Sequence, residues 1–537
     1  MLRFFSKLCH VLKMKDSLYV KAILFTALFS FLAHGFSWFD VAFNHDSLKV
    51  FQLDGNWQAY LGRFLIPAYL SFRGEIVAPL LVAFLSVLFL SLSVVLTVRL
   101  LAIKRTSSII LLSALFATCQ VLTSLYSTYV TAADIQMLSL LFSVLAACFI
   151  FDRRKYLIPA AIVSLAISIA LYQAYAQVFL VLAVLRLIKD RADDGTLDSL
   201  WKNGVRTLSC FVCGALLYYV GWVIYVRIAF DSGISQLPSS GAYNSVDRIS
   251  SLSLRAIPGL IKGTYFMFLK HVLRPEGLHS FYMGVVHFFL AAGSVYLLST
   301  KIRSISGRIW TVLLMLLMPL AANFVYILMG GVTHTLMYFS FIALFAGVVM
   351  SLEIGKADNP NVRHPRLNKG ICVVMSALLL LLVWNNVVYA NQVHVRKSLE
   401  ARATLSVITR LVDRIEQAEG YVPRETEVVF VGNLDKSEVR QIREGYNARH
   451  VLGDHVNFSV TYHETIRDYF NYYLAYPIKV ADRDTAVYFS QMPEVDEMPA
   501  FPSPGCAKMI GDKLVVRLSE YMEIMGSKEF HSSPMGD

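Results

Sequence analysis

Long apolar runs dominate the first 390 residues of the chain, separated by short polar stretches. A helix needs about 20 apolar residues to cross the hydrocarbon core of a bilayer, and most of these runs approach or exceed that length. We therefore expect an all-α polytopic membrane protein with about eleven membrane-spanning helices. The predicted spans cover residues 18–39, 76–101, 107–126, 134–151, 156–172, 174–189, 207–230, 281–300, 309–329, 336–354 and 371–390.

The distribution of Lys and Arg between the runs predicts the orientation of the chain. Basic clusters occur in alternate loops, whereas the turns at 127–133, 172–175 and 330–335 contain neither residue. Short basic loops stay on the cytoplasmic side of a membrane, so we place the N-terminus inside. Two longer loops, at about 40–75 and 231–280, then lie outside, and an odd number of spans puts the C-terminal region outside as well.

The chain from 391 to 537 has a different pattern, which predicts a small soluble α/β domain following a membrane domain of residues 1–390. Apolar positions recur there at helical or alternating spacing rather than in long runs. This region is also acidic, with 17 Lys and Arg against 22 Asp and Glu. The expected helices cover 398–419, 436–445 and 464–474, and the expected strands cover 426–433, 485–491 and 513–519.

Composition supports the membrane assignment and excludes several classes of protein. Hydrophobic residues make up 56% of the chain and charged residues only 16%, too few to solvate a globular protein of 537 residues. The net charge of +11 is concentrated in the membrane region, where it indicates orientation and lipid contact rather than nucleic-acid binding. Cys210 and Cys213 form a CxxC inside an apolar run, and small core residues are a better interpretation than zinc ligands. We expect no cofactor and identify no metal-ligating residues, and the sequence leaves the participation of a divalent ion open.

Carboxylates on the outer side are few, and the first outer loop concentrates them. A carboxylate near a region of low dielectric can act as a general base towards a hydroxyl group. Asp46 and Asp40 are the candidates, and Asp54 follows in the same loop. The alternative is structural, because Asp46 could cap a helix and Asp54-Gly55-Asn56 could form a turn. The other acids placed outside in the membrane region are Glu75, Asp134, Asp231, Asp247 and Glu276.

Cations on the outer side are candidates for binding a lipid phosphate. Residues 55–69 predict an interfacial amphipathic helix with Leu61 and Phe64 towards lipid and Arg63 at the level of the headgroups. The second outer loop carries further basic residues at near-helical intervals. The candidates there are Arg255, Lys262, Lys270 and Arg274. The alternatives are snorkelling of Arg63 and an inert interfacial helix in the second loop.

Other polar and aromatic side chains on the outer side suit sugar hydroxyl groups. Tyr172, Gln173 and Tyr175 belong to the turn that reads YQAY, although an aromatic belt explains them equally well. We also expect sugar or acceptor contacts from the outer loops. These candidates are His45, Asp54, Trp57 and His271.

Taken together, these features resemble the serotype-converting O-antigen glucosyltransferases, the Gtr family of the GT-C class. The resemblance rests on NHDS…DGNWQAYLGRFLIPAY between Asn44 and Tyr69, on YQAY at 172–175, and on a basic multi-span chain with an outer tail. It implies a GT-C-like fold in a bacterial inner membrane, with a cytoplasmic N-terminus and a periplasmic C-terminal domain.

The resemblance also implies a reaction and its partners. Glucose or another hexose would move from a polyprenyl-phosphate donor to a lipid-linked O-antigen on the periplasmic face, with inversion. The family's acidic residue in the first loop falls on Asp46, with Asp40 as the competing position, and Arg63 matches the Arg of its GRF-type motif. Membrane lipids would be further partners. A transporter or flippase, or a polymerase or ligase of lipid-linked glycans, remain the alternatives.

Overall fold

A computed structural model describes residues 17–40, 58–59, 61–74, 76–193, 195–229, 253–275, 277–302, 304–355, 365–434 and 463–520. Within these ranges the chain separates into two compact units. The larger unit contains the described residues up to Trp38, those from 58 to Tyr126, and those from Ala132 to Asn391. The smaller unit contains the described residues from Gln392 onwards, together with Phe39, Asp40 and Ser127–Thr131.

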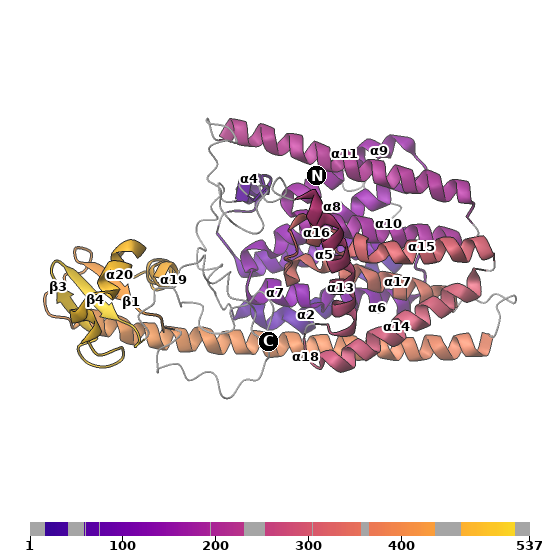
Figure 1. The fold of residues 1–537 in the computed structure, drawn as a ribbon. Helices are drawn as coiled ribbons and strands as arrows, with labels where there is room; N and C mark the ends of the chain where they lie inside the picture. Colours follow the sequence, from indigo (N-terminus) through magenta and orange to yellow (C-terminus); the bar gives the residue numbers. More distant parts are fainter. Residues whose placement is uncertain are drawn as a thin grey trace. The chain divides into compact units, whose positions relative to one another are not determined.

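The larger unit is a bundle of helices, most of which run side by side (Figure 1). Its longer helices are α2 (Ser17–Phe39), α5 (Pro79–Leu100), α6 (Thr106–Ala117), α8 (Ala133–Ile150), α9 (Ile158–Leu171), α10 (Ala176–Ala192), α11 (Leu197–Ala229), α13 (Ile257–Leu273), α14 (Ser280–Lys301), α15 (Ile305–Ala322) and α17 (Phe339–Gly355). The helix α18 (Pro365–Glu416) continues from the larger unit into the smaller one.

Short helices and 3-10 turns connect the long helices of the bundle. They are α4 (Ile66–Arg73), α7 (Gln120–Ser127), η1 (Val130–Ala132), η2 (Lys155–Leu157), η3 (Gln173–Tyr175), η5 (Leu254–Ala256), α16 (Phe324–Leu328) and η6 (Thr335–Met337). Except for η2, they all lie in segments that the sequence places towards the outer side.

Eight described segments are long and apolar enough to cross a membrane. They include α11, whose exposed apolar side chains suit contact with lipid, and the continuous pair α6–α7. Two shorter apolar segments, Lys155–Leu171 and Phe339–Gly355, coincide with further predicted spans. The helical membrane architecture is therefore confirmed, whereas the count of eleven spans stays a prediction.

Breaks in the helices bring polar backbone groups into the bundle, and side chains satisfy them. Gln177, which is buried, donates from Nε2 to Met337 O at 3.2 Å and accepts from Val325 N at 3.1 Å. It thereby joins α10 to η6 and α16. Backbone that departs from a helix at membrane depth needs such partners, because lipid offers none.

The smaller unit contains a four-stranded sheet in the order β2-β1-β4-β3. The strands β2 (Lys479–Val480) and β4 (Lys513–Arg517) pair in parallel with β1 (Glu427–Val431), and β3 (Ala507–Ile510) pairs antiparallel with β4. The smaller unit also contains four short helices. They are α19 (His463–Asp468), the π-helix η8 (Tyr469–Tyr473), α20 (Arg483–Ser490) and α21 (Pro493–Asp496).

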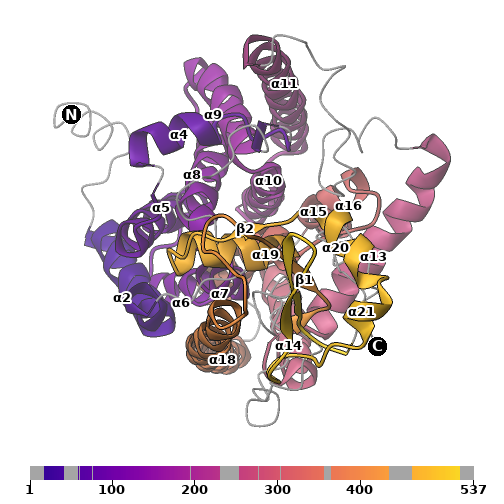
Figure 2. The ribbon, with the colours of Figure 1, turned by 90° about the vertical axis from the view of Figure 1, so that its left-hand side faces the viewer.

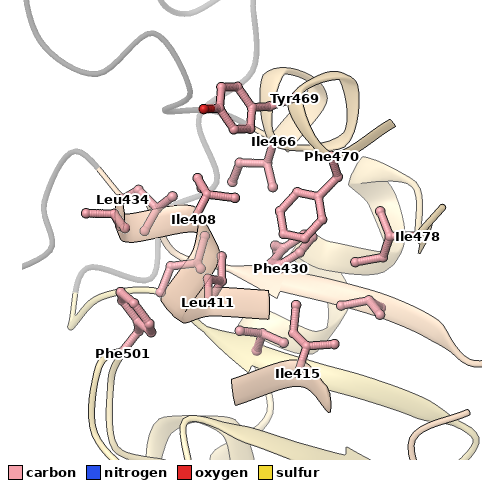
Figure 3. Close-up of a cluster of buried hydrophobic side chains, with 14 of the residues drawn as sticks. Ile408, Leu411, Ile415, Phe430, Leu434, Ile466, Tyr469, Phe470, Ile478 and Phe501 are labelled. Atoms are coloured by element: carbon pink, nitrogen blue, oxygen red, sulfur yellow. The ribbon is translucent and has the colours of Figure 1, made fainter. Parts of the chain in front are cut away.

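Side chains that alternate along β1 form hydrophobic cores on both faces of the sheet. Phe430 and Val428 belong to the core that includes Ile408 of α18 and Phe470 of η8 (Figure 3). Val429 and Val431 pack on the other face, against α20 and α21. The end of α18 is therefore an integral part of the smaller unit.

The predicted strand at 485–491 is wrong, because this segment forms α20. Asp482 caps this helix by accepting a hydrogen bond from Thr485 N at 2.7 Å. The predicted strands at 426–433 and 513–519 correspond to β1 and β4, and the predicted helix at 398–419 is the end of α18. The predicted helix at 436–445 lies outside the described residues, and the domain boundary at 390 stays a prediction.

Candidate functional site

The segment 58–74, which closes the first outer loop, is fixed to the bundle by several polar contacts. Trp222 of α11 donates to Ala59 O at 2.9 Å, and Gln173 of η3 donates to Leu61 O. Further along, Leu65 N donates to Ala170 O of α9 at 3.4 Å. The short helix α4 accordingly lies at one end of α8 and α9 (Figure 2).

The predicted amphipathic helix over 55–69 is wrong in its boundaries and in its exposed face. Residues 61–65 interrupt it with a turn in which Gly62 has a φ of 78°, and the helix α4 begins at Ile66. Leu61 is buried, and Phe64 packs against Tyr218 and Tyr225 of α11 rather than facing lipid. Glycine allows this left-handed turn, which directs the following residues back onto the bundle.

Arg63 lies in this turn and stacks on one of the predicted sugar-binding residues. Its guanidinium carbon is 4.6 Å from the ring centroid of Tyr172, a cation–π geometry. Its Nε is buried and has no hydrogen-bond partner among the described residues. A guanidinium held on one face by an aromatic ring, with an unused donor, is well suited to an anion.

A buried ion pair anchors the other end of α4 and was not predicted from the sequence. Arg73 Nη1 lies 3.0 and 3.2 Å from the two carboxylate oxygens of Asp134 on α8, and both side chains are almost fully buried. The hydroxyl of Tyr69 donates to Asp134 Oδ2 at 2.8 Å. Burial and the charge of Asp134 raise the pKa of Tyr69, so its hydroxyl stays protonated and acts as the donor.

The two remaining members of the YQAY turn make contacts inside the bundle. Gln173 also contacts the hydroxyl of Tyr218 at 3.3 Å. Tyr175 is only 1% exposed, and its hydroxyl donates to Gln136 Oε1 at 3.3 Å. Tyr172 and Gln173 are therefore next to the segment 58–74, whereas Tyr175 belongs to the core of the bundle.

The four candidate cations of the second outer loop are all exposed, but they do not gather at one point. Arg255 lies in η5, Lys262 and Lys270 lie on α13, and Arg274 follows directly after this helix. At a rise of about 1.5 Å per residue they extend over roughly 28 Å, far more than one phosphate spans. Only Lys270 and Arg274, four residues apart, can converge on a single phosphate.

His271, on the same helix, packs among aromatic rings, and its contact with a sugar stays a prediction. Its ring centroid is 4.1 Å from that of Tyr338 and 5.1 Å from that of Phe341. Its Nε2 is buried and lacks a hydrogen-bond partner within the described part of the chain.

Of the two candidate bases, the structure describes only Asp40, which follows α2 and belongs to the smaller unit. Its Oδ2 accepts a hydrogen bond from Ser398 Oγ and lies 3.3 Å from Arg402 Nη2, both on α18. The other candidate, Asp46, lies outside the described residues, as do His45, Asp54 and Trp57. The described residues contain no group of three or more His, Cys, Asp or Glu that could hold a metal ion.

The comparison with known proteins identifies the family of the chain. Among curated proteins, none matches. A family model described as Glucosyl transferase GtrII matches residues 35–350, which is more than half of the chain. The matched region includes both long outer loops, the YQAY turn and the Arg73–Asp134 pair, and it confirms the resemblance seen in the sequence. The chain belongs to the Glucosyl transferase GtrII family.

Proposed function

We propose that this protein transfers glucose, or another hexose, from a polyprenyl-phosphate donor to a lipid-linked O-antigen on the periplasmic face of the inner membrane. The family match over residues 35–350 carries the proposal, because it covers Asp40, Asp46 and Arg63 in the first outer loop. Glycosyl transfer by a helical membrane protein agrees with both the family and the fold. The match favours a transferase over a transporter, polymerase or ligase.

The reaction we propose is a single displacement with inversion. A carboxylate of the first outer loop, from Asp40 or Asp46, accepts the proton of an acceptor hydroxyl. The acceptor oxygen forms a bond to the anomeric carbon while the bond from that carbon to the phosphate oxygen breaks. The polyprenyl phosphate leaves with the electron pair of the broken bond. A phosphate leaving group needs no proton, but it needs positive charge close to the departing oxygen.

Arg63 is the residue that we propose for this phosphate. Its buried Nε without a described partner and its stacking on Tyr172 support the assignment. Lys270 and Arg274 form the second candidate pair, since they are exposed and four residues apart. We assign contacts with the sugar to Tyr172 and Gln173, which lie at the same segment as Arg63. No cofactor enters this scheme.

A test of the donor uses cells that make a defined O-antigen and lack any other enzyme that modifies it. Mass spectrometry of lipopolysaccharide is compared with and without the gene, in cells that have or lack the synthase for polyprenyl-phosphate glucose. We expect one added hexose per repeat only when both the gene and the synthase are present. Modification that persists without the synthase would contradict the proposed donor, and no modification in any strain would contradict the proposed transfer.

A further inference from the structure

The surroundings of Asp40 point to a role for the smaller unit. Asp40 directly follows α2, yet its side chain forms hydrogen bonds and an ion pair with residues beyond position 391. Ser398 and Arg402 lie on the same face of α18, one turn apart, and both approach Oδ2. The C-terminal region therefore supplies the groups that hold this carboxylate.

The arrangement around the carboxylate is that of an oriented base. Both contacts end on Oδ2, while Oδ1 accepts no hydrogen bond from the described residues. The side chain of Asp40 is 35% exposed, so the carboxylate is partly accessible. Fixing one oxygen sets the direction in which the other accepts a proton, and such positioning is worth large factors in rate.

The helix that carries Ser398 and Arg402 continues into the core of the smaller unit. Ile408, which lies six residues after Arg402 on α18, packs in one core with Phe430 of β1 and Phe470 of η8 (Figure 3). The π-helix η8 ends at Tyr473, whose pKa is raised by burial and, secondly, by the charge of Asp40. The hydroxyl of Tyr473 therefore stays protonated.

We propose that Ser398 and Arg402 of the C-terminal region are positioning residues for the reaction, and that they orient Asp40 by holding its Oδ2 so that Oδ1 receives the acceptor's proton. This inference rests on the proposed function and decides between the two candidate bases in favour of Asp40. It also assigns the C-terminal region a part in the transfer step itself.

The test measures hexose transfer by the full-length protein in nanodiscs, with polyprenyl-phosphate glucose as donor and purified lipid-linked O-antigen as acceptor. The variants are Arg402→Ala, Arg402→Lys and Ser398→Ala. Matched controls are Arg410→Ala and Ser406→Ala, which alter exposed residues of the same helix. Arg402 is 71% exposed, so its truncation is not expected to unfold the protein. Thermal unfolding is followed for every variant.

We expect Arg402→Ala and Ser398→Ala to lower kcat at least ten-fold, with KM for both substrates within two-fold and an unchanged Tm. Arg402→Lys should recover part of the loss, and the controls should match the wild type. In the double variant Asp40→Asn/Arg402→Ala, the loss should not exceed that of Asp40→Asn alone, because both changes act on one step.

Three results would overturn the inference, and they differ in what else they affect. If Asp40→Asn abolishes transfer while Arg402→Ala and Ser398→Ala keep wild-type kcat, Asp40 remains the base but the C-terminal residues do not position it. If Asp40→Asn itself keeps wild-type kcat, the assignment of Asp40 is lost as well, although glycosyl transfer by this protein stands. A loss that appears only in KM or Tm also contradicts a positioning role.

Discussion

The ion pair between Arg73 and Asp134 is the residue-scale feature with the clearest effect on stability. Asp134→Ala leaves a guanidinium buried without its carboxylate, which we expect to lower the free energy of unfolding by about 3–5 kcal/mol. Replacing both residues, as in Arg73→Met/Asp134→Leu, should cost less than Asp134→Ala alone, because no charge is left unpaired. Chemical unfolding in detergent measures the free energy of unfolding of both variants.

A matched control uses an ion pair on the surface. Lys202 Nζ lies 2.6 Å from Asp198 Oδ2, but the two side chains are 74% and 72% exposed. We expect Lys202→Ala to change the free energy of unfolding by less than about 1 kcal/mol. If Asp134→Ala were as mild as Lys202→Ala, the buried pair would not anchor α4.

Arg63 is the residue whose substitution should separate binding from chemistry. We expect Arg63→Ala to raise KM for the lipid donor about ten-fold or more, since a charged hydrogen bond to phosphate contributes about 1.5–3 kcal/mol. Arg63→Lys should be intermediate, because an ammonium group keeps the charge but loses the stacking on Tyr172. Steady-state kinetics with a varied donor concentration measure the effect. Arg227→Ala, an exposed arginine on α11, is the control, and an equal rise in KM there would contradict the assignment.

Individual site residues could be selected from the sequence, but their partners could not. Arg63, Tyr172 and Gln173 were predicted separately, and the structure places all three at the segment 58–74. Asp134 was among the outer carboxylates, whereas Arg73 lies 61 positions earlier and its role was missed. Hydropathy places a residue at one end of a helix, but only packing decides which helix lies beside it. The sequence did contain one signal for this pair, because Arg73 and Asp134 both lie near the predicted outer ends of spans.

The helix α13 gives a prediction at the scale of one element. Lys270 and Arg274 are close enough to hold one phosphate, whereas Lys262 and Arg255 lie too far along the helix to join them. We expect Lys270→Ala/Arg274→Ala to raise the donor KM several-fold more than Arg255→Ala/Lys262→Ala, which removes the same charge. Equal effects of the two double variants would show that only the overall charge of α13 matters.

Elements were predictable where one physical signal dominates. All eleven apolar runs correspond to helices. In lipid a spanning segment can satisfy its backbone hydrogen bonds only within itself, and a helix does so. The segment 485–491 was misassigned because its aromatic and β-branched residues resemble a strand, while the N-cap at Asp482 and the burial of Ala486 and Phe489 indicate a helix. The strand β3 was missed, although Gly511-Asp512 between two apolar runs is a hairpin signal.

The topology is a prediction at the scale of the whole molecule. With the N-terminus inside, eleven spans place the C-terminal region in the periplasm, whereas eight would place it in the cytoplasm. We expect Arg410→Cys to react with a charged, membrane-impermeant maleimide in intact cells. Lys202→Cys should react only after the cells are opened. The opposite pattern would contradict eleven spans.

The native thiol of the C-terminal region should not interfere with this measurement. Cys506 is fully buried in the core of the smaller unit, and burial raises the pKa of its thiol. A protonated and inaccessible thiol reacts slowly with maleimides, so the wild-type protein provides the background. Labelling of Cys506 should appear only on unfolding.

The most direct test of the whole account is the number of hexoses that the protein adds per O-antigen repeat when its first-loop carboxylates are removed. Mass spectrometry of lipopolysaccharide compares the wild type with Asp40→Asn, Asp46→Asn and the double variant, at matched protein levels in the membrane. We predict one added hexose per repeat for the wild type, none for Asp40→Asn or for the double variant, and retained transfer for Asp46→Asn. Transfer by the double variant at the wild-type level would contradict the claim that a carboxylate of this loop accepts the proton.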